Sequence, residues 1–567
     1  MCGIFALLNY TNTNANTKSI IDCHLITCHL ITDNFDKGVN RGPESSTIIF
    51  NESLNYVKGF HRLAINGLNK ESNQPLNFES CSLICNGEIY NYKQLYQMMN
   101  ITPTTDSDCE VIIHLYLKYG IHQTIRMLDG VFAFVLFTPD TIFVARDPYG
   151  VRPLYLIGRE LSGTDSLLGF TSELKTLCNI ANSVGQQVNH FLPGSLMTIN
   201  KVSHSVNDNT VWKINDYLSY HTPSFSYSTD SFLASADNFG FDTKLQTYLK
   251  GIFGTLMSSV TKRYATTERP IACLLSGGLD SSLIAAIVCS IHKQSNKNGS
   301  KIETYSIGLP DSEDIKYARI VADYIGSKHT EIIVSEQDML DAIPEVIVAI
   351  ESYDTTSVRA SIGNYLIGKY IKTHSEAKVI FNGDGSDELC GGYLYMSSCP
   401  DSIEYDKETL RLLKDIYLFD VLRSDKSISS HGLEPRTPFL DKAFVNYYLS
   451  IPLEFRNHNL NKKMEKYLLR MAFEESQLLP PEILWRKKEA FSDGVSNKGK
   501  SLFTIIQDYT DTKITDASLN QKQKEKKYYK DIFDAAYPNQ SHIVPYFWMP
   551  KYINSDDPSA RTLTSYK

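Results

Sequence analysis

Apolar and polar positions follow different patterns in the two halves of the chain. In the first half, short apolar runs are separated by turn residues, and the clearest pair is Val131–Phe137 and Thr141–Ala145, joined by Thr138–Asp140. Two β-type runs joined by a tight polar turn are typical of a hairpin. The pattern therefore predicts antiparallel sheets for the first half.

Apolar runs in the second half alternate with helical patterns. Ile271–Leu275 precedes a helical pattern at Ser281–His292, and Ile302–Ile307 precedes another at Ile315–Ile325. Later, Val379–Phe381 leads into a second glycine-rich turn. This alternation predicts a parallel sheet covered by helices, with ligands bound at the carboxyl ends of its strands.

The boundary between the halves is a polar stretch. The chain has 567 residues, more than one hydrophobic core usually organises. Ser219–Asn238 is rich in Ser and Tyr and poor in aliphatic residues, and a periodic apolar segment begins near Leu245. We therefore expect a first domain at residues 1–215, a linker at 216–240 and a second domain at 241–567.

Composition and charge exclude several classes of protein. With 42% hydrophobic and 21% charged residues the chain is typical of a folded globular protein. Its net charge of -8 argues against nucleic-acid or anionic-membrane partners. No apolar stretch approaches the ~18 residues of a transmembrane helix, so a cytoplasmic location is expected. Eleven cysteines without C-x-x-C spacing indicate reduced thiols and argue against zinc.

The first candidate for chemistry is Cys2, which is followed by Gly3. Removal of Met1 would leave a thiol and a free α-amine on one residue, and an α-amine has a pKa of ~7.7–8.0, so it can accept the thiol proton near neutral pH. By itself, however, a cysteine here is more typical of a buried residue in a first strand, Gly3–Asn9.

Companion motifs change that interpretation. They are residues 41–45 (RGPES), 62–65 (RLAI), 86–91 (NGEIYN) and 107–110 (SDCE). Together with the MCGIF start, they resemble the class II glutamine amidotransferases. The fold implied by this resemblance is the αββα sandwich of the N-terminal-nucleophile hydrolases, in which two sheets lie between layers of helices.

The resemblance also implies roles for five residues. Arg62 would clamp the α-carboxylate of glutamine through charge-assisted hydrogen bonds, while Asp108 and Glu88 would bind its ammonium group. The Asn86 side chain and the Gly87 N–H would stabilise the oxyanion formed when the thiolate attacks, an effect worth ~2.7–4 kcal/mol per donor.

A phosphate-binding loop is expected in the second half. Residues 276–282, SGGLDSS, lie between an apolar strand and a helix, where small residues and a helix N-terminus favour an anion. The loop lacks the G-x-x-x-x-G-K-[ST] pattern of kinase-type loops. It resembles instead the pyrophosphate loop of the ATP pyrophosphatases, which cleave ATP into AMP and pyrophosphate.

ATP and Mg²⁺ follow from this second resemblance. Asp280 and Asp387 would coordinate the metal, with phosphate oxygens completing the site. The residues implied to bind ATP are Leu275, Ser276, Gly277, Gly278, Asp280, Ser281, Ile307, Asn382 and Gly383.

Ordered motifs beyond the loop narrow the resemblance to one family, the glutamine-hydrolysing asparagine synthetases. They are residues 351–356 (ESYDTT), 359–361 (RAS), 383–388 (GDGSDE), 391–393 (GGY), 436–441 (RTPFLD), 485–489 (WRKKE), 545–550 (PYFWMP) and 557–561 (DPSAR). The resemblance therefore runs over nearly the whole chain, and implies a doubly wound parallel-sheet ATP-pyrophosphatase domain with added helices.

The implied reaction joins ammonia from glutamine to aspartate. The β-carboxylate of aspartate would attack MgATP to give β-aspartyl-AMP, from which ammonia displaces AMP. Lys488 would neutralise charge on the phosphoryl group, and Glu351 would take a proton from the attacking ammonia. Glutamine, aspartate and ATP are the expected partners, and a homodimer is compatible with the sequence. Asn382, Asp384 and Lys487 depart from the family pattern and predict altered use of ATP.

Three alternatives stay open at the level of sequence. A β-lactam-forming synthetase has a similar scaffold, but it needs no glutamine. The intact Cys2, Arg62 and Asp108 argue against this alternative, because they are the residues expected to act on glutamine. An amidotransferase acting on another carboxylic acid would share every derived feature, since aspartate follows only from the resemblance. A non-catalytic binding protein would not need complete catalytic residues in both halves.

Overall fold

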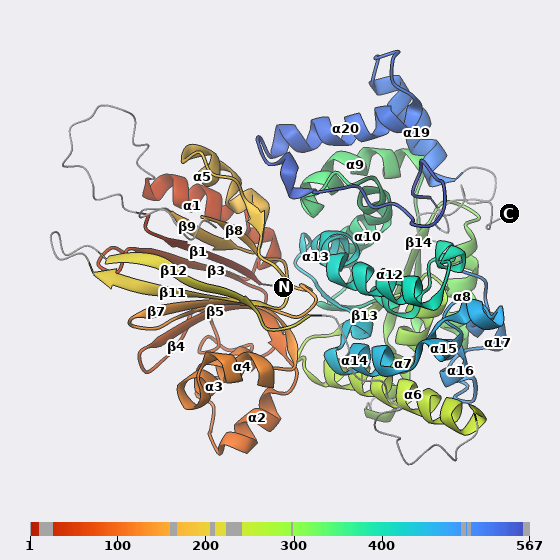
Figure 1. Cartoon of the computed structure of the whole chain (residues 1–567), viewed down its shortest axis with the longest axis horizontal. Coiled ribbons are helices and arrows are strands. Elements are labelled where there is room, and N and C mark those ends of the chain that lie inside the picture. The colour runs from red at the N-terminus through yellow and green to blue at the C-terminus, as the bar shows by residue number, and fades with distance from the viewer. Residues whose placement is uncertain are drawn as a thin grey trace. The chain divides into compact units, whose positions relative to one another are not determined.

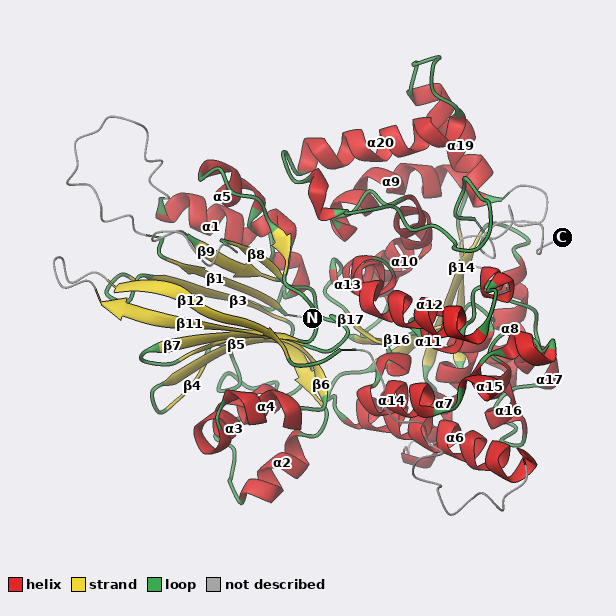
Figure 2. Cartoon of the chain, viewed as in Figure 1, coloured by secondary structure: helices red, strands yellow, loops and turns green. Residues whose placement is uncertain are grey.

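The structure is a computed structural model that describes residues 2–10, 27–158, 167–203, 210–222, 241–295, 299–488, 495 and 501–559. The chain divides into two compact units (Figures 1 and 2). Unit 1 comprises Met1–Thr222, Ser429–Leu433 and Phe533–Pro545, and unit 2 comprises Pro223–Ile428, Glu434–Ile532 and Tyr546–Lys567. Two short segments from late in the chain therefore complete the unit that the first 222 residues begin.

Unit 1 contains two six-stranded antiparallel sheets, ordered β10-β8-β9-β1-β3-β2 and β12-β11-β7-β6-β5-β4. The strands of the first sheet are β1 (Gly3–Leu8), β2 (Ser45–Asn51), β3 (Tyr56–Arg62), β8 (Tyr155–Ile157), β9 (Leu168–Thr171) and β10 (Asn189–His190). Those of the second are β4 (Leu76–Phe78), β5 (Cys81–Ile89), β6 (Gly130–Phe137), β7 (Thr141–Arg146), β11 (Ser195–Ser203) and β12 (Thr210–Ser219).

Alternation of side chains along the strands explains how these sheets stack. On β5, Ile84 packs with Ile4 of the other sheet, whereas its neighbours Leu83 and Cys85 join a second core with Leu95 and Ile112. Each sheet thus buries one face against the other sheet.

Helices cover the outer faces. They are α1 (Cys28–Asp36) and α5 (Cys178–Ser183) on one side, and α2 (Tyr92–Met99), α3 (Val111–Tyr119) and α4 (Ile121–Met127) on the other (Figure 1). The predicted αββα sandwich and the predicted hairpin, now β6 and β7, are confirmed.

Unit 2 is built on a five-stranded parallel sheet in the order β15-β14-β13-β16-β17. Its strands are β13 (Ile271–Leu274), β14 (Glu303–Gly308), β15 (Lys328–Ile333), β16 (Val379–Phe381) and β17 (Glu434–Arg436). Later strands add on both sides of the central β13, so the strand order reverses between β13 and β16. Ligands of doubly wound sheets bind at this point, outside the carboxyl ends of the strands.

Helices accompany the sheet of unit 2, and the predicted alternation of strands and helices is confirmed. The longer helices are α6 (Phe241–Ala265), α7 (Leu279–Ser295), α8 (Glu313–Ile325), α9 (Glu336–Ile350), α10 (Thr355–His374), α12 (Ser402–Asp415), α13 (Asp420–Ser429), α14 (Lys442–Ser450), α16 (Tyr467–Glu474), α19 (Leu502–Lys513) and α20 (Gln521–Ala536). The shorter ones are α11 (Ser386–Cys390), α15 (Leu453–Arg456) and α17 (Pro481–Leu484). No helix in the described part of the chain is long and apolar enough to cross a membrane.

The predicted linker at residues 216–240 is partly a strand. Strand β12 continues to Ser219, because Leu218 and Tyr217 pair with Leu196 and Met197 of β11. Residues 223–240 lie outside the described residues. The late segment Phe533–Pro545 belongs to unit 1, where the Gln540 side chain accepts a hydrogen bond from Val188 N at 2.9 Å.

Candidate active sites

Cys2 directly precedes β1 and is half-buried. Its Sγ lies 3.5 Å from the carbonyl oxygen of Leu63, and its own carbonyl accepts a hydrogen bond of 3.0 Å from Nε of the buried Arg41. Every described cysteine is a free thiol. Met1, whose removal would expose the α-amine, lies outside the described residues. The backbone of Cys2 is therefore fixed on one side by Arg41.

Asn86 and Gly87 lie side by side on β5, opposite Ala133 and Phe132. The Asn86 side chain is fully buried, and its Oδ1 has no hydrogen-bond partner among the described residues. Its Nδ2 lies 3.5 Å from Oγ of Ser172, which also accepts a bond of 3.1 Å from Ile4 N. Ser172 thus connects Asn86 to the strand that follows Cys2.

Position 87 must be a glycine because strands β5 and β6 approach each other closely there. A Cβ at this position would lie 2.5 Å from the carbonyl oxygen of Val131 on the neighbouring strand, closer than any side chain allows. The glycine therefore permits the tight pairing that places Asn86 and the Gly87 N–H on one strand.

Arg62, Glu88 and Asp108 are held by the loops around β5. Arg62 ends β3 and donates a hydrogen bond of 2.9 Å to the carbonyl of Asn69. Asp108 is buried, and its Oδ2 accepts a bond of 2.6 Å from Ile89 N, at the end of the Asn86 strand. Glu88 Oε2 accepts one of 2.6 Å from the Asn66 side chain. These bonds connect the loop that follows Arg62 and the loop before α3 to the same strand.

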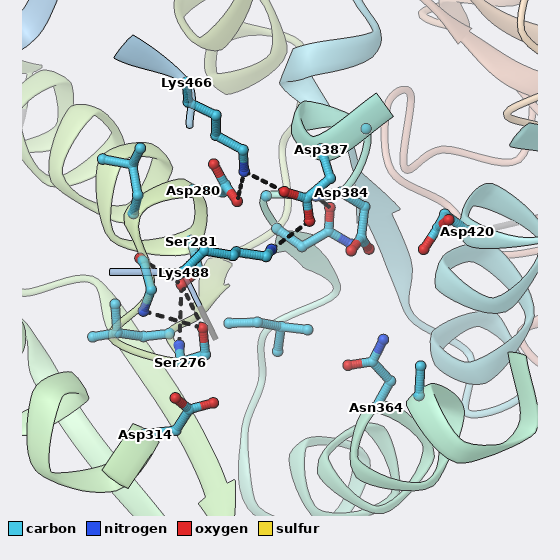
Figure 3. A pocket seen from close by; sticks show the side chains of 18 of the residues that line it. Ser276, Asp280, Ser281, Asp314, Asn364, Asp384, Asp387, Asp420, Lys466 and Lys488 are labelled. Carbon is cyan, nitrogen blue, oxygen red and sulfur yellow. Dashed lines mark hydrogen bonds and ion pairs between the residues drawn. The ribbon is translucent and has the colours of Figure 1, made fainter. Parts of the chain in front are cut away.

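Unit 2 contains a cavity at the point where the strand order of its sheet reverses (Figure 3). The loops that follow β13 and β16 both reach it. Of the residues predicted to bind ATP or metal, those that line it are Leu275, Ser276, Gly278, Asp280, Ser281, Ile307, Asn382, Gly383 and Asp387, together with Lys488. Gly277 is not in the lining, and its carbonyl accepts a bond of 2.9 Å from Arg486.

Two carboxylates and two ammonium groups meet in this cavity. Nζ of Lys466 lies 2.5 Å from both Asp280 Oδ2 and Asp387 Oδ1, and Nζ of Lys488 lies 2.5 Å from Asp387 Oδ2 (Figure 3). Burial alone would raise the pKa of Asp387, but the two lysines lower it well below its usual range. Burial would lower the pKa of Lys466, but Asp280 and Asp387 raise it. Asp387 and Lys466 are therefore both charged at neutral pH.

A second charged group lies beside the first. Arg423 contacts Asp384 at 3.3 Å and Asp420 at 2.7 Å. Burial raises the pKa of the Asp384 carboxyl despite the opposing charge of Arg423, and Asp384 Oδ2 has no hydrogen-bond partner among the described residues. Burial and the charge of Asp420 also raise the pKa of Glu388 well above its usual value. Asp384 thus presents one unused acceptor to the cavity that it lines.

Glu351 does not line this cavity. It is the C-cap residue of α9, with a left-handed backbone at φ 56°, and its fully buried carboxylate contacts Nζ of the equally buried Lys426. The proton-accepting role of Glu351 stays a prediction, and in this structure its carboxylate pairs with Lys426 and does not line the cavity.

Sequence reasoning missed Lys466, Arg423 and Asp420. Lys466 follows the polar run 457–463 and precedes α16, and no motif marks it. Arg423 and Asp420 are on α13, in a segment with an ordinary mixture of charges. Only the tertiary fold brings them to the loops after β13 and β16.

The carboxylates of Asp280 and Asp387 fit a magnesium ion bound together with phosphates. Both contact the same ammonium group, so they converge. Among the described residues, no group of three or more His, Cys, Asp or Glu side chains is arranged as a metal site. Mg²⁺ in nucleotide sites needs only one or two carboxylates, because phosphate oxygens and water supply the other ligands.

Comparison with known proteins covers both units. A family model described as "Asparagine synthase" matches residues 254–405 and 397–552, and one described as "Glutamine amidotransferase domain" matches residues 1–216. The chain is 43% identical over 555 residues to "Asparagine synthetase [glutamine-hydrolyzing]" of Gallus gallus, covering 94% of this chain and 95% of that protein. It is 40% identical over 565 residues to the Homo sapiens protein of the same name, with the same coverage.

Proposed function

The chain belongs to the glutamine-hydrolysing asparagine synthetase family, and from this membership we propose how its two units divide the reaction. The enzyme makes asparagine from aspartate at the expense of ATP, with nitrogen taken from glutamine. Unit 1 carries the match to the glutamine amidotransferases, so it releases ammonia. Unit 2 carries the match to the synthetases, so it activates aspartate.

In unit 1 the thiolate of Cys2 attacks the side-chain amide of glutamine, and the α-amine of the same residue takes the thiol proton. Asn86 and the N–H of Gly87 bind the developing oxyanion. Support comes from the buried Asn86 side chain, which Ser172 connects to the strand after Cys2. Arg62 binds the α-carboxylate of glutamine, and Asp108 its ammonium group, with Glu88 beside them.

In unit 2 the triphosphate of ATP lies along the loop after β13 and the first turn of α7, where Ser276, Gly278 and Ser281 line the cavity. Asp280 and Asp387 would hold Mg²⁺, which would neutralise phosphate charge. The β-carboxylate of aspartate attacks the α-phosphorus to give β-aspartyl-AMP and pyrophosphate. Lys466 and Lys488 stabilise the charge that develops on the phosphoryl oxygens.

Asp384 is the residue we assign to proton transfer from ammonia as it displaces AMP. It lines the cavity, has an acceptor oxygen without a partner among the described residues, and has a pKa raised by burial. A carboxyl group whose pKa is raised by burial holds a transferred proton more readily than an exposed one. Glu351 is paired with Lys426 and does not line the cavity.

The observation that carries the proposal for unit 2 is the convergence of Asp280, Lys466, Asp387 and Lys488 at the switch point of a doubly wound sheet. The test is product identification by mass spectrometry with ¹⁵N-amide glutamine, aspartate and ATP, with and without Mg²⁺. Labelled asparagine, AMP and pyrophosphate are expected only when Mg²⁺ is present. Glutamate release without asparagine, even with Mg²⁺, would point to another carboxylic acid as acceptor.

A further inference from the structure

Glu110 lies at the base of the loop of residues 104–108, which leads into the short helix η2 (Asp108–Glu110). Its carboxylate accepts hydrogen bonds from the backbone N–H groups of Thr104 and Thr105 at 2.8 and 2.7 Å. The hydroxyl groups of both threonines also donate to it, that of Thr104 at 2.8 Å. Four donors from two consecutive residues therefore converge on one carboxylate.

His114 supports this carboxylate from the first turns of α3. Its Nε2 lies 2.9 Å from Glu110 Oε1, and the two residues are only 3% and 1% exposed. The ring centroid of His114 is 4.4 Å from that of Phe78 and 5.7 Å from that of Tyr96. The imidazole is thus fixed by aromatic packing, and it fixes Glu110 in turn.

The same loop is bonded to the loop that follows Arg62. Asp106 N donates to Ser72 Oγ at 3.1 Å, and the side chain of Asn69 donates to Asp106 Oδ2 at 2.6 Å. The carbonyl of Asn69 is the group that accepts from Arg62. Hydrogen bonds, together with the peptide bond between Thr105 and Asp106, therefore connect Glu110 to Arg62.

We infer that Glu110 is a positioning residue for glutamine, which it never touches. By holding residues 104–108, it fixes Asp108 against β5 and fixes the Asn69 loop beside Arg62. The distance between Asp108, which binds the ammonium group of glutamine, and Arg62, which binds its α-carboxylate, is thereby kept constant. This inference rests on the proposed roles of Arg62 and Asp108. Burial favours the neutral acid, yet hydrogen bonds from His114, Thr105 and Thr104 lower the pKa of Glu110 to about 2, so it accepts as an anion at working pH.

The main test is the Glu110→Gln variant, which keeps the shape of the side chain. It replaces one carboxylate oxygen by an NH₂ group, which cannot accept hydrogen bonds from the threonines. The KM for glutamine should rise by about tenfold or more, because a buried hydrogen-bond set is lost. The kcat for glutamine hydrolysis at saturation should change much less, and ammonia-dependent asparagine synthesis should be unchanged. A Thr105→Val variant, which removes one donor, should raise the KM by a smaller factor.

A matched control is Asp147→Asn. Asp147 is also buried and accepts three backbone hydrogen bonds, from Tyr149, Val151 and Arg152, but its loop is residues 147–152. This variant should lose stability without a change in the KM for glutamine. An equal rise in KM for Asp147→Asn would show a general softening of unit 1, which would overturn the inference.

Other outcomes separate the inference from the function on which it rests. An unchanged KM in folded Glu110→Gln and Thr105→Val proteins, beside a raised KM in Asp108→Asn, would overturn the positioning role alone. An unchanged KM in Asp108→Asn would instead remove the assigned ammonium site. If Glu110→Gln does not fold, the test rests on Thr105→Val. A folded Thr105→Val protein with an unaltered KM for glutamine would then overturn the inference.

Discussion

The ammonium group of Lys466 lies 2.5 Å from a carboxylate oxygen of Asp387. The same group lies 2.5 Å from Asp280, so one buried lysine joins the first turn of α7, which follows β13, to α11, which follows β16. Two carboxylates this close would repel each other without a cation between them. Lys466 therefore sets the spacing of the proposed metal ligands before any nucleotide arrives.

Replacement of Lys466 by Met should abolish most synthesis. Loss of a preorganised charge at a phosphoryl-transfer site costs about 10²–10³-fold in rate. Pyrophosphate release with ammonium chloride as nitrogen source measures this, and glutamine hydrolysis in unit 1 should persist. Lys462→Met, an exposed lysine nearby, is the matched control. Pyrophosphate release at the wild-type rate in Lys466→Met would refute the assignment.

Replacement of Cys2 by Ala should separate the two activities. Glutamine-dependent synthesis is expected to disappear, because alanine has no nucleophile, while ammonia-dependent synthesis continues. Asparagine formation with each nitrogen source is the measurement. Cys28→Ala, which changes an exposed thiol of α1, should leave both activities intact. Loss of both activities in Cys2→Ala would contradict the division of labour between the units.

Replacement of Asp384 by Asn should slow nitrogen transfer by about 10²-fold or more, the usual contribution of a general base. The measurement is ammonia-dependent asparagine formation at saturating aspartate and ATP. A Glu351→Gln variant provides the comparison, because loss of its buried partnership with Lys426 should lower stability first. A larger kinetic defect in a stably folded Glu351→Gln protein would restore Glu351 as the base.

The carboxylate of Glu110 should make the stability of unit 1 depend on pH. Its folded-state pKa of about 2 lies below the ordinary value of 4.5, so the stabilisation is complete above pH 4.5 and is lost as the pH falls towards 2. Denaturant titration at pH 7 should show Glu110→Gln to be less stable by about 1–3 kcal/mol. The difference between variant and wild type should shrink steadily below pH 4.5. A constant difference would show that the charge is unimportant.

Replacement of Arg359 by Leu should strongly destabilise unit 2. The buried guanidinium contacts Glu525 at 2.6 Å and Asp557 at 2.8 Å. Its loss removes the positive charge beside two buried carboxylates, which should lower the free energy of unfolding by about 3–5 kcal/mol. Thermal unfolding measures the loss. Arg319→Leu removes an exposed pair with Glu331 and should leave the unfolding temperature nearly unchanged. Similar losses in the two variants would mean that burial of the Arg359 cluster is unimportant.

Local patterns were sufficient to predict much of the fold and part of both sites. The hairpin of β6 and β7 and the alternation around β13 and β14 depend on neighbours in sequence, so periodicity revealed them. The segment from β13 to the start of α7 contains a strand, small residues and a helix N-terminus within a few positions, which is a local signal. Asp280 and Lys488 were found because each lies within a recognisable motif, and the structure places both at the cavity.

Long-range relationships could not be predicted in the same way. Glu351 is within a family-like motif, but its contact with Lys426, which is 75 residues away in the chain, could not be predicted from that motif. Lys466 lies in no recognisable motif. It follows Asp280 by 186 residues in the chain, and only the tertiary fold brings its ammonium group to the Asp280 carboxylate. Burial and partner choice at such positions depend on the tertiary fold, about which a single sequence gives little information.

The division of the chain has a consequence for how the protein is made on the ribosome. Unit 1 begins with the first residues, but it includes Ser429–Leu433 and Phe533–Pro545. Domains generally fold as units while the chain emerges from its N-terminus. The N-terminal unit therefore reaches its final state only after residue 545 has been translated, when almost the entire chain has been synthesised.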